Sequence, residues 1–534
     1  MRRLSVASLV IALAACVGSR VDSDPPATGP DGGSITAKAC GPGNPCERGS
    51  CVDGFCCDAA CDGVCEACNV PGKEGICSPV SGKPVHGACD GEAAGPCAGS
   101  CDGTQAKACA YPEVECGTGS CAGGTATLPQ KCKAGACLAA ETQTCSLGCF
   151  EEGCLGVQQV TGGYYFTCAL LTDKRVRCWG DNSVGQVGQA PSGTPATDVY
   201  NAPTPVGSLS NVQMIASTFA TACALLADGT VRCWGENLAG QLGNGTVDAS
   251  TLPHHVPSAV LGVTGATFLA GSSAGHFCAI VAGGTLKCWG SNGAGQLGDG
   301  ALGGNAPTPV TVCRRGSTGL PCMPSTGATF VAGGDKHTCA IFTGGQVSCW
   351  GGNDGGELGQ PAPTGRLFPT DVPGLTATHL TLGNRLSCAA SGGTAKCWGA
   401  NGIGRLGNGT DATDGTTPTA VCTKQDCSTT LTAVTAVTTY DESSCAIAGG
   451  AVKCWGTNTG GQLGDGNAST SQNYAATTAI ASGAVAVASG GGVNFAIVVD
   501  RANRDVRCWG NEGKSQCGTG GPSADRRTPV SPKW

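Results

Sequence analysis

The side chains best placed to do chemistry in this chain are its cysteines, which number 39 among 534 residues. A Cys-Trp-Gly triplet recurs seven times, and in six of these repeats another cysteine stands nine or ten residues before the triplet. The triplets begin at Cys178, Cys233, Cys288, Cys349, Cys397, Cys454 and Cys508. Cysteines at fixed spacings form disulfides in an oxidising compartment or bind zinc. Their register on the folded chain decides between the two.

Strand register favours disulfides within the repeats. Between Cys388 and Cys397, a two-residue turn at Gly392-Gly393 places the cysteines opposite each other at a non-hydrogen-bonded position. The Cα atoms there lie about 4.5 Å apart, at the short end of what a disulfide spans. Cysteines spaced by ten need one more turn residue, as in a three-residue loop with a bulge. The predicted hairpin disulfides are Cys168/Cys178, Cys223/Cys233, Cys278/Cys288, Cys339/Cys349, Cys388/Cys397 and Cys445/Cys454.

The other reactive residue types form no catalytic pattern. His276 and His337 occupy equivalent points of neighbouring repeats, where structural hydrogen bonding explains them better than catalysis. The adjacent pair His254-His255 lies in a proline-bounded loop and is more typical of solvated residues than of metal ligands. A nucleophile elbow places its Gly-x-Ser-x-Gly turn directly before a helix, and no helix-length periodic stretch interrupts the repeats; the chain also has no phosphate-binding loop. We therefore expect no enzyme activity, no cofactor and no metal site.

Short β-strands must position the cysteines. Each repeat, about 55 residues long, alternates Val or Leu with polar residues and is broken by Asp-Gly or Gly-Gly turns. Seven four-stranded units that cannot bury their faces alone are best satisfied by closing into a ring. The predicted fold is all-β, a seven-bladed β-propeller over residues 157–534. The tryptophan of each triplet points to the opposite strand face from its cysteine and is expected to pack against a neighbouring blade. These blade-core residues are Trp179, Trp234, Trp289, Trp350, Trp398, Trp455 and Trp509.

The repeat resembles the regulator of chromosome condensation repeat family. Residues 228–235 read Asp-Gly-Thr-Val-Arg-Cys-Trp-Gly and residues 335–340 read Asp-Lys-His-Thr-Cys-Ala, both close to the family pattern, and Gly-Gln-Leu-Gly follows at 240–243. The resemblance covers about residues 157–534 and implies a seven-bladed propeller. Its best-known activity, guanine-nucleotide exchange on a small nuclear GTPase together with chromatin binding, is a property of the family and not of the fold.

The seventh repeat departs from the others. Phe495 stands where the first cysteine belongs, and Cys517 replaces the leucine of Gly-Gln-Leu-Gly, so we infer a Cys508/Cys517 disulfide. Two further pairs, Cys313/Cys322 and Cys422/Cys427, fall in loop insertions. The chain ends on Thr528-Pro-Val530, a segment that elsewhere precedes a new repeat. We expect it to join the first blade and close the ring.

The first residues predict export and a lipid anchor. Arg2 and Arg3 precede a short apolar core, and residues 13–16, Leu-Ala-Ala-Cys, resemble a bacterial lipobox, which makes residues 1–16 a signal peptide and Cys16 the lipidated residue. An ordinary signal peptide is the alternative. Val17 after the lipobox implies the outer membrane. Residues 17–39, rich in Asp, Pro, Gly and Ser, predict a disordered tether.

Residues 40–156 predict a separate disulfide-rich module. They hold twenty cysteines, a density typical of exported domains with little hydrophobic core, and the sequence leaves their connectivity open. Cys65 and Cys68 have zinc-ligand spacing, which export argues against. Residues 54–61 resemble small cysteine-rich modules that precede repeats in secreted myxobacterial proteins. Apart from Cys16, every cysteine of the chain can be paired.

Charge and compartment narrow the function. A net charge of −7 and the absence of long basic runs argue against nucleic-acid binding, and an exported protein does not meet a nuclear GTPase. We expect a monomeric, non-catalytic module, lipid-anchored in the outer membrane at the cell surface or facing the periplasm, that binds a protein or glycan through variable insertions. The alternatives are a structural envelope protein and an exchange-factor-like regulator. The insertions are residues 190–201, 301–326 and 410–431.

Overall fold

The computed structural model describes residues 38–47, 49–89, 95–192, 198–360, 364–411, 414–467, 471–500 and 503–534. Cys16, the predicted signal peptide and nearly all of the predicted tether lie outside these residues. The chain divides into two units, Met1–Thr118 with Pro129–Glu141, and Gly119–Leu128 with Thr142–Trp534. Within the described residues, no helix is long and apolar enough to cross a membrane.

The first unit is held together by disulfides around very short strands. It contains β1 (Ser50–Val52), β2 (Phe55–Cys57), β3 (Glu66–Ala67), β4 (Ser78–Pro79), β5 (Ser81–Gly82), β6 (Cys101–Asp102), β9 (Cys132–Lys133) and β10 (Ala136–Cys137). Its disulfides are Cys40–Cys51, Cys46–Cys56, Cys57–Cys68, Cys61–Cys77, Cys65–Cys101, Cys89–Cys109, Cys97–Cys132 and Cys116–Cys137. Cys65 and Cys68 are thus bonded to other cysteines and do not form a zinc site.

The second unit begins with five short strands and two disulfides. The strands are β7 (Ser120–Ala122), β8 (Thr125–Thr127), β11 (Thr142–Thr144), β12 (Cys149–Phe150) and β13 (Gly153–Cys154). The disulfides are Cys121–Cys149 and Cys145–Cys154.

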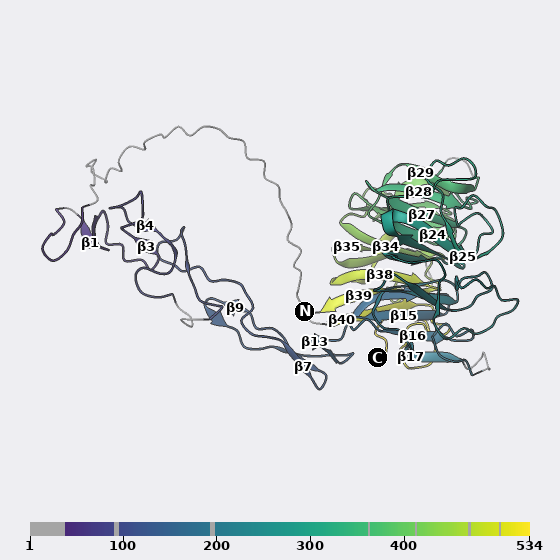
Figure 1. Ribbon diagram of the computed structural model, residues 1–534, viewed down its shortest axis with the longest axis horizontal. Helices are drawn as coiled ribbons and strands as arrows, with labels where there is room; N and C mark the ends of the chain where they lie inside the picture. Colours follow the sequence, from purple (N-terminus) through teal and green to yellow (C-terminus); the bar gives the residue numbers. More distant parts are fainter. Residues whose placement is uncertain are drawn as a thin grey trace. The chain divides into compact units, whose positions relative to one another are not determined.

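Seven four-stranded antiparallel sheets follow and form the blades of a propeller (Figure 1), which confirms the predicted fold. Blades 1 to 3 are β14 (Val157–Gly162), β15 (Phe166–Leu171), β16 (Val176–Asp181) and β17 (Val199–Pro205); β18 (Val212–Ser217), β19 (Thr221–Leu226), β20 (Val231–Gly235) and β21 (Ser258–Ala259); β22 (Phe268–Gly271), β23 (His276–Val281), β24 (Thr285–Gly290) and β25 (Ala306–Thr311). Blades 4 and 5 are β26 (Ala328–Gly333), β27 (His337–Phe342), β28 (Gln346–Gly351) and β29 (Arg366–Thr376); β30 (His379–Leu382), β31 (Leu386–Ser391), β32 (Thr394–Gly399) and β33 (Gly415–Ala420). Blades 6 and 7 are β34 (Val434–Tyr440), β35 (Ser443–Ala448), β36 (Ala451–Gly456) and β37 (Gln472–Ile480); β38 (Ala484–Gly490), β39 (Val493–Asp500), β40 (Asn503–Gly510) and β41 (Arg526–Val530). Helical structure among the described residues is confined to two 3₁₀ turns, Ala282–Gly284 and Gly402–Gly404.

The central hairpin of the blades has the register that the cysteine spacing predicts. In blade 5, Cys388 lies opposite Cys397 across the Gly392-Gly393 turn. In blade 1 the turn has three residues and ends on Lys174 in the left-handed conformation, with φ +67°, so Cys168 again lies opposite Cys178. The Cα atoms of the six hairpin disulfides are 4.0 to 4.1 Å apart.

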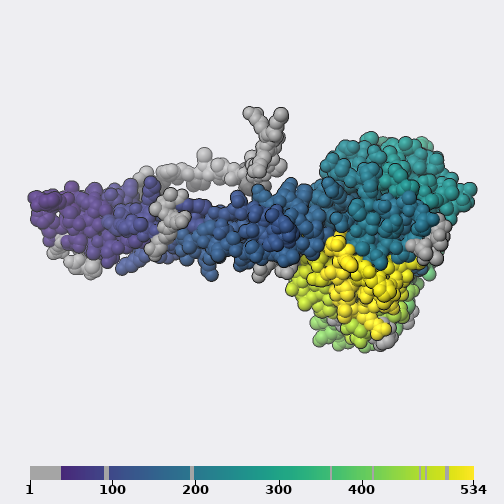
Figure 2. Space-filling model, turned by 90° about the horizontal axis from the view of Figure 1, so that it is seen from below, coloured from purple at the N-terminus to yellow at the C-terminus, as the bar shows by residue number. Residues whose placement is uncertain are grey.

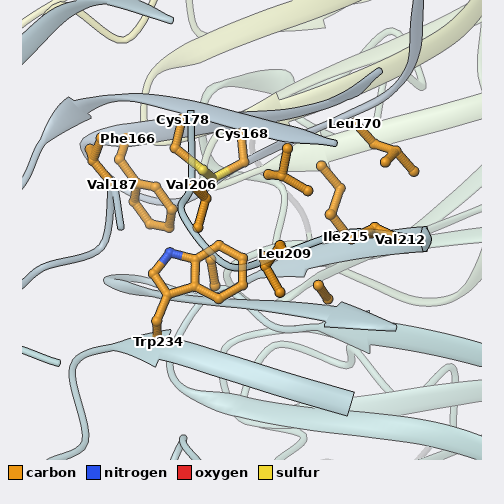
Figure 3. Packing of buried hydrophobic residues seen from close by; sticks show 13 residues of the cluster. Phe166, Cys168, Leu170, Cys178, Val187, Val206, Leu209, Val212, Ile215 and Trp234 are labelled. Carbon is orange, nitrogen blue, oxygen red and sulfur yellow. A yellow bond between two sulfur atoms is a disulfide. The ribbon is translucent and has the colours of Figure 1, made fainter. Parts of the chain in front are cut away.

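Each blade core is shared with the next blade. Around Trp234 of blade 2, residues of blade 1 such as Phe166, Leu170 and the Cys168–Cys178 disulfide form one buried cluster (Figure 3). All seven triplet tryptophans are fully buried. A disulfide is compact and apolar, and in a chain with 4% aromatic residues the buried hairpin disulfides fill part of each blade core.

One hydrogen bond repeats at every junction between blades. The indole Nε1 of each triplet tryptophan donates to the main-chain carbonyl of the Gly-Gln-Leu-Gly loop, or its equivalent, in the preceding blade. The acceptors, for Trp234, Trp289, Trp350, Trp398, Trp455, Trp509 and Trp179 in turn, are Gln186, Gln241, Gln296, Glu357, Arg405, Gln462 and Gln516, at 2.6 to 3.0 Å. The last pair joins blade 7 to blade 1 and closes the ring.

The prediction that the C-terminal segment joins the first blade is wrong. Residues 526–530 form β41, the fourth strand of blade 7, with Val530 opposite Cys508. The Thr-Pro-Val segments occupy the same place in other blades, since Thr204 pairs with Cys178 and Val310 with Cys288. The motif therefore ends a repeat and does not precede one. The final residue reaches the first blade, where the Trp534 ring meets Trp179 edge to face at 5.8 Å. In Figure 2 these yellow C-terminal residues lie beside the blue and teal residues of the first blades.

Candidate binding groove at one end of the propeller

The antiparallel order of each blade gathers two sets of loops at one end of the propeller. The connection from the first to the second strand and that from the third to the fourth lie at this end, and the other connections lie at the opposite end. The first strands line the central channel. Side chains on the first-to-second loops therefore surround the mouth of that channel.

One position in each repeat forms this rim. It lies four residues before the first hairpin cysteine, or before Phe495 in the seventh repeat. We call these residues the mouth ring: Tyr164, Phe219, Ala274, Asp335, Asn384, Asp441 and Gly491. The first six line a single hollow at the channel mouth, with Ser273 and Tyr440. Neighbouring loops are tied together, because the Tyr164 amide donates to the Phe219 carbonyl at 2.9 Å.

The mouth ring is aromatic on one side. The rings of Tyr164 and Phe219 are stacked, with centroids 4.7 Å apart and planes inclined by 18°. The Tyr165 ring meets Tyr164 edge to face at 4.4 Å. Phe219 is 43% exposed and Tyr165 is 40% exposed. Aromatic residues make up 4% of this chain, so two exposed aromatic side chains at one place are unusual. An exposed stacked pair of this kind is typical of a surface that contacts a ligand.

The mouth ring is acidic on the other side. Within the described part of the chain, the Asp335 carboxylate has no hydrogen-bond or ion-pair partner. Burial raises its pKa, and the negative charge of Asp441 raises it further, against the opposing effect of the Lys336 ammonium. The Asp441 carboxylate accepts one long hydrogen bond, 3.4 Å, from the Asn384 amide. Asp441 has φ +45° in its two-residue turn, a conformation that aspartate tolerates better than most residues.

Tyr440 lies beside these two carboxylates and beside Tyr164. Its hydroxyl is buried, and among the described residues nothing forms a hydrogen bond with it. Burial and the negative charge of Asp441 raise the pKa of this phenol far above its usual value, so it stays a neutral donor. A buried hydroxyl without a partner costs stability, and its oxygen marks a place that can accept a hydrogen bond from an N–H group of a ligand.

The hollow at the mouth continues on both sides. Through Tyr164, Tyr440 and Asp441 it joins a second hollow over blades 6 and 7, lined also by Glu442 and Asn511. Through Ala274 and Asp335 it joins a third over blades 3 and 4, which contains Lys336, Asp354, Leu302 and Leu367. The third hollow has a volume of about 700 Å³. The three hollows share these lining residues and lie side by side at this end of the propeller, and we call them together the groove.

The two histidines at equivalent repeat positions lie away from this groove and serve the fold. His276 Nε2 is 2.9 Å from the Thr338 hydroxyl, which itself donates to the Gln296 carbonyl at 2.7 Å. The hydroxyl must therefore accept from His276, and the imidazole is the neutral Nε2–H form. His337 makes the same arrangement with Ser387, whose hydroxyl donates to Glu357. Burial lowers the pKa of both histidines to about 3. Their role is to join adjacent blades.

The other histidines are placed differently. His379 lines the channel, its ring 4.9 Å from Phe330, and burial lowers its pKa to about 4. The His254 Nε2 atom lies 2.7 Å from the Asp248 carboxylate, so this imidazole has a side-chain partner within its own loop. His86 lies 3.4 Å from Asp53.

The predicted binding insertions are not free loops. Each contains a fourth strand or its beginning: β25 within 301–326, β33 within 410–431 and the first residues of β17 within 190–201. The Cys313–Cys322 and Cys422–Cys427 disulfides close the segments that follow β25 and β33. The Thr-Pro segments pair with the third strand of their blade as a fourth strand. This pairing is why the predicted insertions are not loops throughout.

The remaining sequence-predicted residues lie as follows. Cys508 and Cys517 are bonded to each other, and Phe495 lies opposite Cys508 in the hairpin. The cysteine groups close enough to hold a metal among the described residues consist of sulfurs already in disulfides. Cys16 lies outside the described residues. The mouth ring was missed, although its constant offset from the first cysteine is visible in the sequence, because that position varies between repeats.

Four segments of the propeller match a known family model. A family model described as the regulator of chromosome condensation (RCC1) repeat matches residues 157–186, 213–241, 271–296 and 328–357, that is, the beginnings of blades 1 to 4. These segments of the first four blades therefore match the RCC1 repeat, in agreement with the resemblance of the repeat pattern.

Curated relatives match part of the chain. The bovine secretion-regulating guanine nucleotide exchange factor is 33% identical over 220 residues, covering 40% of this chain and 44% of the relative. The human probable E3 ubiquitin-protein ligase HERC6 is 31% identical over 213 residues, 39% of this chain and 20% of the relative. The Arabidopsis thaliana ultraviolet-B receptor UVR8 is 28% identical over 229 residues, 42% and 48%. The chain thus spans less than half the length of these relatives.

Solved structures show the same fold. Human WBSCR16 superposes with a TM-score of 0.55 at 16% identity, covering 67% of this chain and 94% of that structure. Yeast RCC1 (Prp20), in its complex with Kap60, gives a TM-score of 0.54 at 18% identity, with 71% of this chain and 84% of that one covered. At such identities the likeness concerns the fold.

Proposed function

We propose that this propeller is a non-catalytic module that binds a protein partner, and that the groove at the mouth ring is its binding surface. Propellers of RCC1 repeats occur in complexes with proteins, as in the yeast structure with Kap60. The observation that carries the proposal is the mouth ring itself. Seven equivalent positions, held by a rigid disulfide-bonded ring, differ from one repeat to the next, and rigid scaffolds with variable loops are typical of binding proteins.

We also propose that the protein works outside the cytoplasm, anchored in the outer membrane by lipid on Cys16. The disulfides support this compartment, because every cysteine except Cys16 is paired and thiols stay reduced in the cytosol. The lipobox-like sequence before Cys16 supports the anchor. A partner is then expected in the envelope or the medium and not among cytosolic proteins.

A capture experiment tests the binding proposal. The full chain, immobilised, is incubated with envelope extract and culture supernatant, and bound proteins are identified. We expect a discrete partner that Phe219→Ala fails to retain and that Val485→Ala retains. Val485 is a matched control because it is 50% exposed at the start of β38, at the opposite end of the propeller. Equal capture by both variants, or no partner at all, would contradict the proposal and favour an architectural role.

A further inference from the structure

The mouth ring has unpaired negative charge next to exposed aromatic faces. Asp335 has no partner within the described residues, and Asp441 has only the long contact with Asn384. A carboxylate shielded from water is unfavourable unless a positive charge approaches it. Lys336, whose ammonium acts on Asp335, is exposed, and Arg405, which contacts the Asn384 carbonyl, is already paired with Glu442 at 3.3 Å.

Tyr164 and Phe219 stand across the ring from these carboxylates. A cation over an aromatic face is attracted by the ring quadrupole, and the attraction grows when the site is shielded from water. The Tyr440 hydroxyl, buried and without a partner among the described residues, lies between the two sides. Carboxylates, aromatic faces and a free hydroxyl around one hollow are suited to the head group of an organic cation and not to an anion.

The shape of the groove indicates which kind of ligand carries that cation. The central hollow is open on two sides, toward Glu442 and Asn511 in one direction and toward Asp354 and Leu302 in the other. An extended chain can run along such a groove with one side chain directed into the mouth. Carboxylates lie along the whole path, with Lys336 the one cation that lines it among the described residues.

We infer that the mouth ring receives a lysine or arginine side chain from an extended basic segment of a protein partner, which lies along the groove. This inference rests on the proposed binding function and names the chemistry of the partner. The cationic head group contacts Asp335 and Asp441, and its stem packs on Tyr164 and Phe219. A flanking basic residue of the segment is attracted by Asp354.

Defined peptides test the inference with the full chain. The probe is a fluorescently labelled nine-residue peptide with one central arginine and two flanking lysines in a Gly-Ser background. The comparison probes are the same peptide with Glu at the three charged positions and a set of labelled neutral oligosaccharides. We expect the basic peptide to bind, with an affinity that falls as salt rises, and the comparison probes not to bind.

Isosteric variants separate the mouth from the rest of the surface. Asp335→Asn and Asp441→Asn are each expected to weaken binding of the basic peptide about tenfold. Asp228→Asn is the matched control, since this exposed aspartate lies in a hairpin turn at the opposite end and its replacement is expected to leave binding unchanged. Near-ultraviolet circular dichroism of each variant verifies that the fold is intact.

The outcomes distinguish the inference from the function on which it rests. If Asp335→Asn and Asp441→Asn bind the basic peptide as the wild type does, or if an oligosaccharide or the acidic peptide binds instead, the inference is overturned. In that case a partner captured by the wild type and lost in Phe219→Ala still supports the groove as a binding surface. The inference and the proposed function are both supported if Asp335→Asn and Asp441→Asn lose peptide binding and Phe219→Ala loses the captured partner. The variants must be folded, and Asp228→Asn must bind the peptide as the wild type does.

Discussion

At the residue scale, the propeller depends on a hydrogen bond that each repeat makes with its predecessor. The triplet tryptophan donates to a buried loop carbonyl, and in some junctions a second donor shares that acceptor. Gln296 accepts from both Trp350 and Thr338. Phe277 replaces the hydroxyl residue at the neighbouring junction, so Gln241 accepts from Trp289 alone among the described residues.

This difference predicts unequal costs for one substitution made at two sites. Trp350→Phe and Trp289→Phe remove the same atoms, but only the second leaves a buried carbonyl without a donor. We expect Trp289→Phe to lower the free energy of unfolding by about 1 kcal/mol more than Trp350→Phe. Denaturant unfolding of both variants with disulfides intact measures the difference. Equal destabilisation would show that loss of the last donor to the Gln241 carbonyl carries no extra cost.

The buried histidines predict acid sensitivity. His276 and His337 stay neutral in the folded protein, with pKa values of about 3, whereas an unfolded histidine titrates near ~6.5. Between these values the unfolded chain binds more protons, so stability is fully present above pH ~6.5 and falls as the pH is lowered toward 3. Each histidine contributes a slope of up to ~1.4 kcal/mol per pH unit.

The measurement is the midpoint of thermal unfolding between pH 7 and pH 4, with wild type and His337→Gln compared. Glutamine keeps a neutral donor but cannot take up the proton. The variant is expected to be less stable at pH 7 and to lose stability less steeply on acidification. Parallel curves would mean that His337 is not held neutral by the fold.

At the scale of elements, turn length and loop glycines decide how the blades fit together. Two-residue and three-residue turns both bring the hairpin cysteines opposite each other, because the longer turn ends in a left-handed residue such as Gly229, with φ +77°. The last glycine of the Gly-Gln-Leu-Gly loop has a different task. At Gly298, with φ +70°, a Cβ atom would lie 2.5 Å from Trp350 Nε1.

Gly298→Ala is therefore predicted to be far more harmful than an alanine at another left-handed glycine. Gly304 has φ +77°, and a Cβ atom added there would meet no other atom within 4 Å, so Gly304→Ala carries only the backbone cost, about 1 kcal/mol. Gly298→Ala adds a collision with a buried indole, worth a further ~1–3 kcal/mol. Thermal unfolding compares the two. A similar loss in both variants would show that the loop yields without disturbing the junction.

At the scale of the whole molecule, the sequence predicts what is local and repeated. Register from Gly392-Gly393 to Cys388 and Cys397 depends only on turn geometry, and the seven triplets imply a closed ring. Closure itself involves residues far apart, such as Gln516 and Trp179. The place of β41 was mispredicted because its Thr-Pro-Val segment was assigned to the start of a repeat, whereas it pairs within its own blade. The mouth ring was not predicted either, since only closure of the propeller brings Tyr164 and Asp335 to one hollow.

The central claim is a fully oxidised propeller that works outside the cytoplasm. The most direct measurement is the intact mass of the protein from its native envelope, before and after reduction. We predict a chain that begins at Cys16, carries added acyl groups and gains 38 hydrogens on reduction, as expected when all but one of the 39 cysteines are paired. An unprocessed chain with free thiols would contradict the claim and return the search for partners to the cytosol.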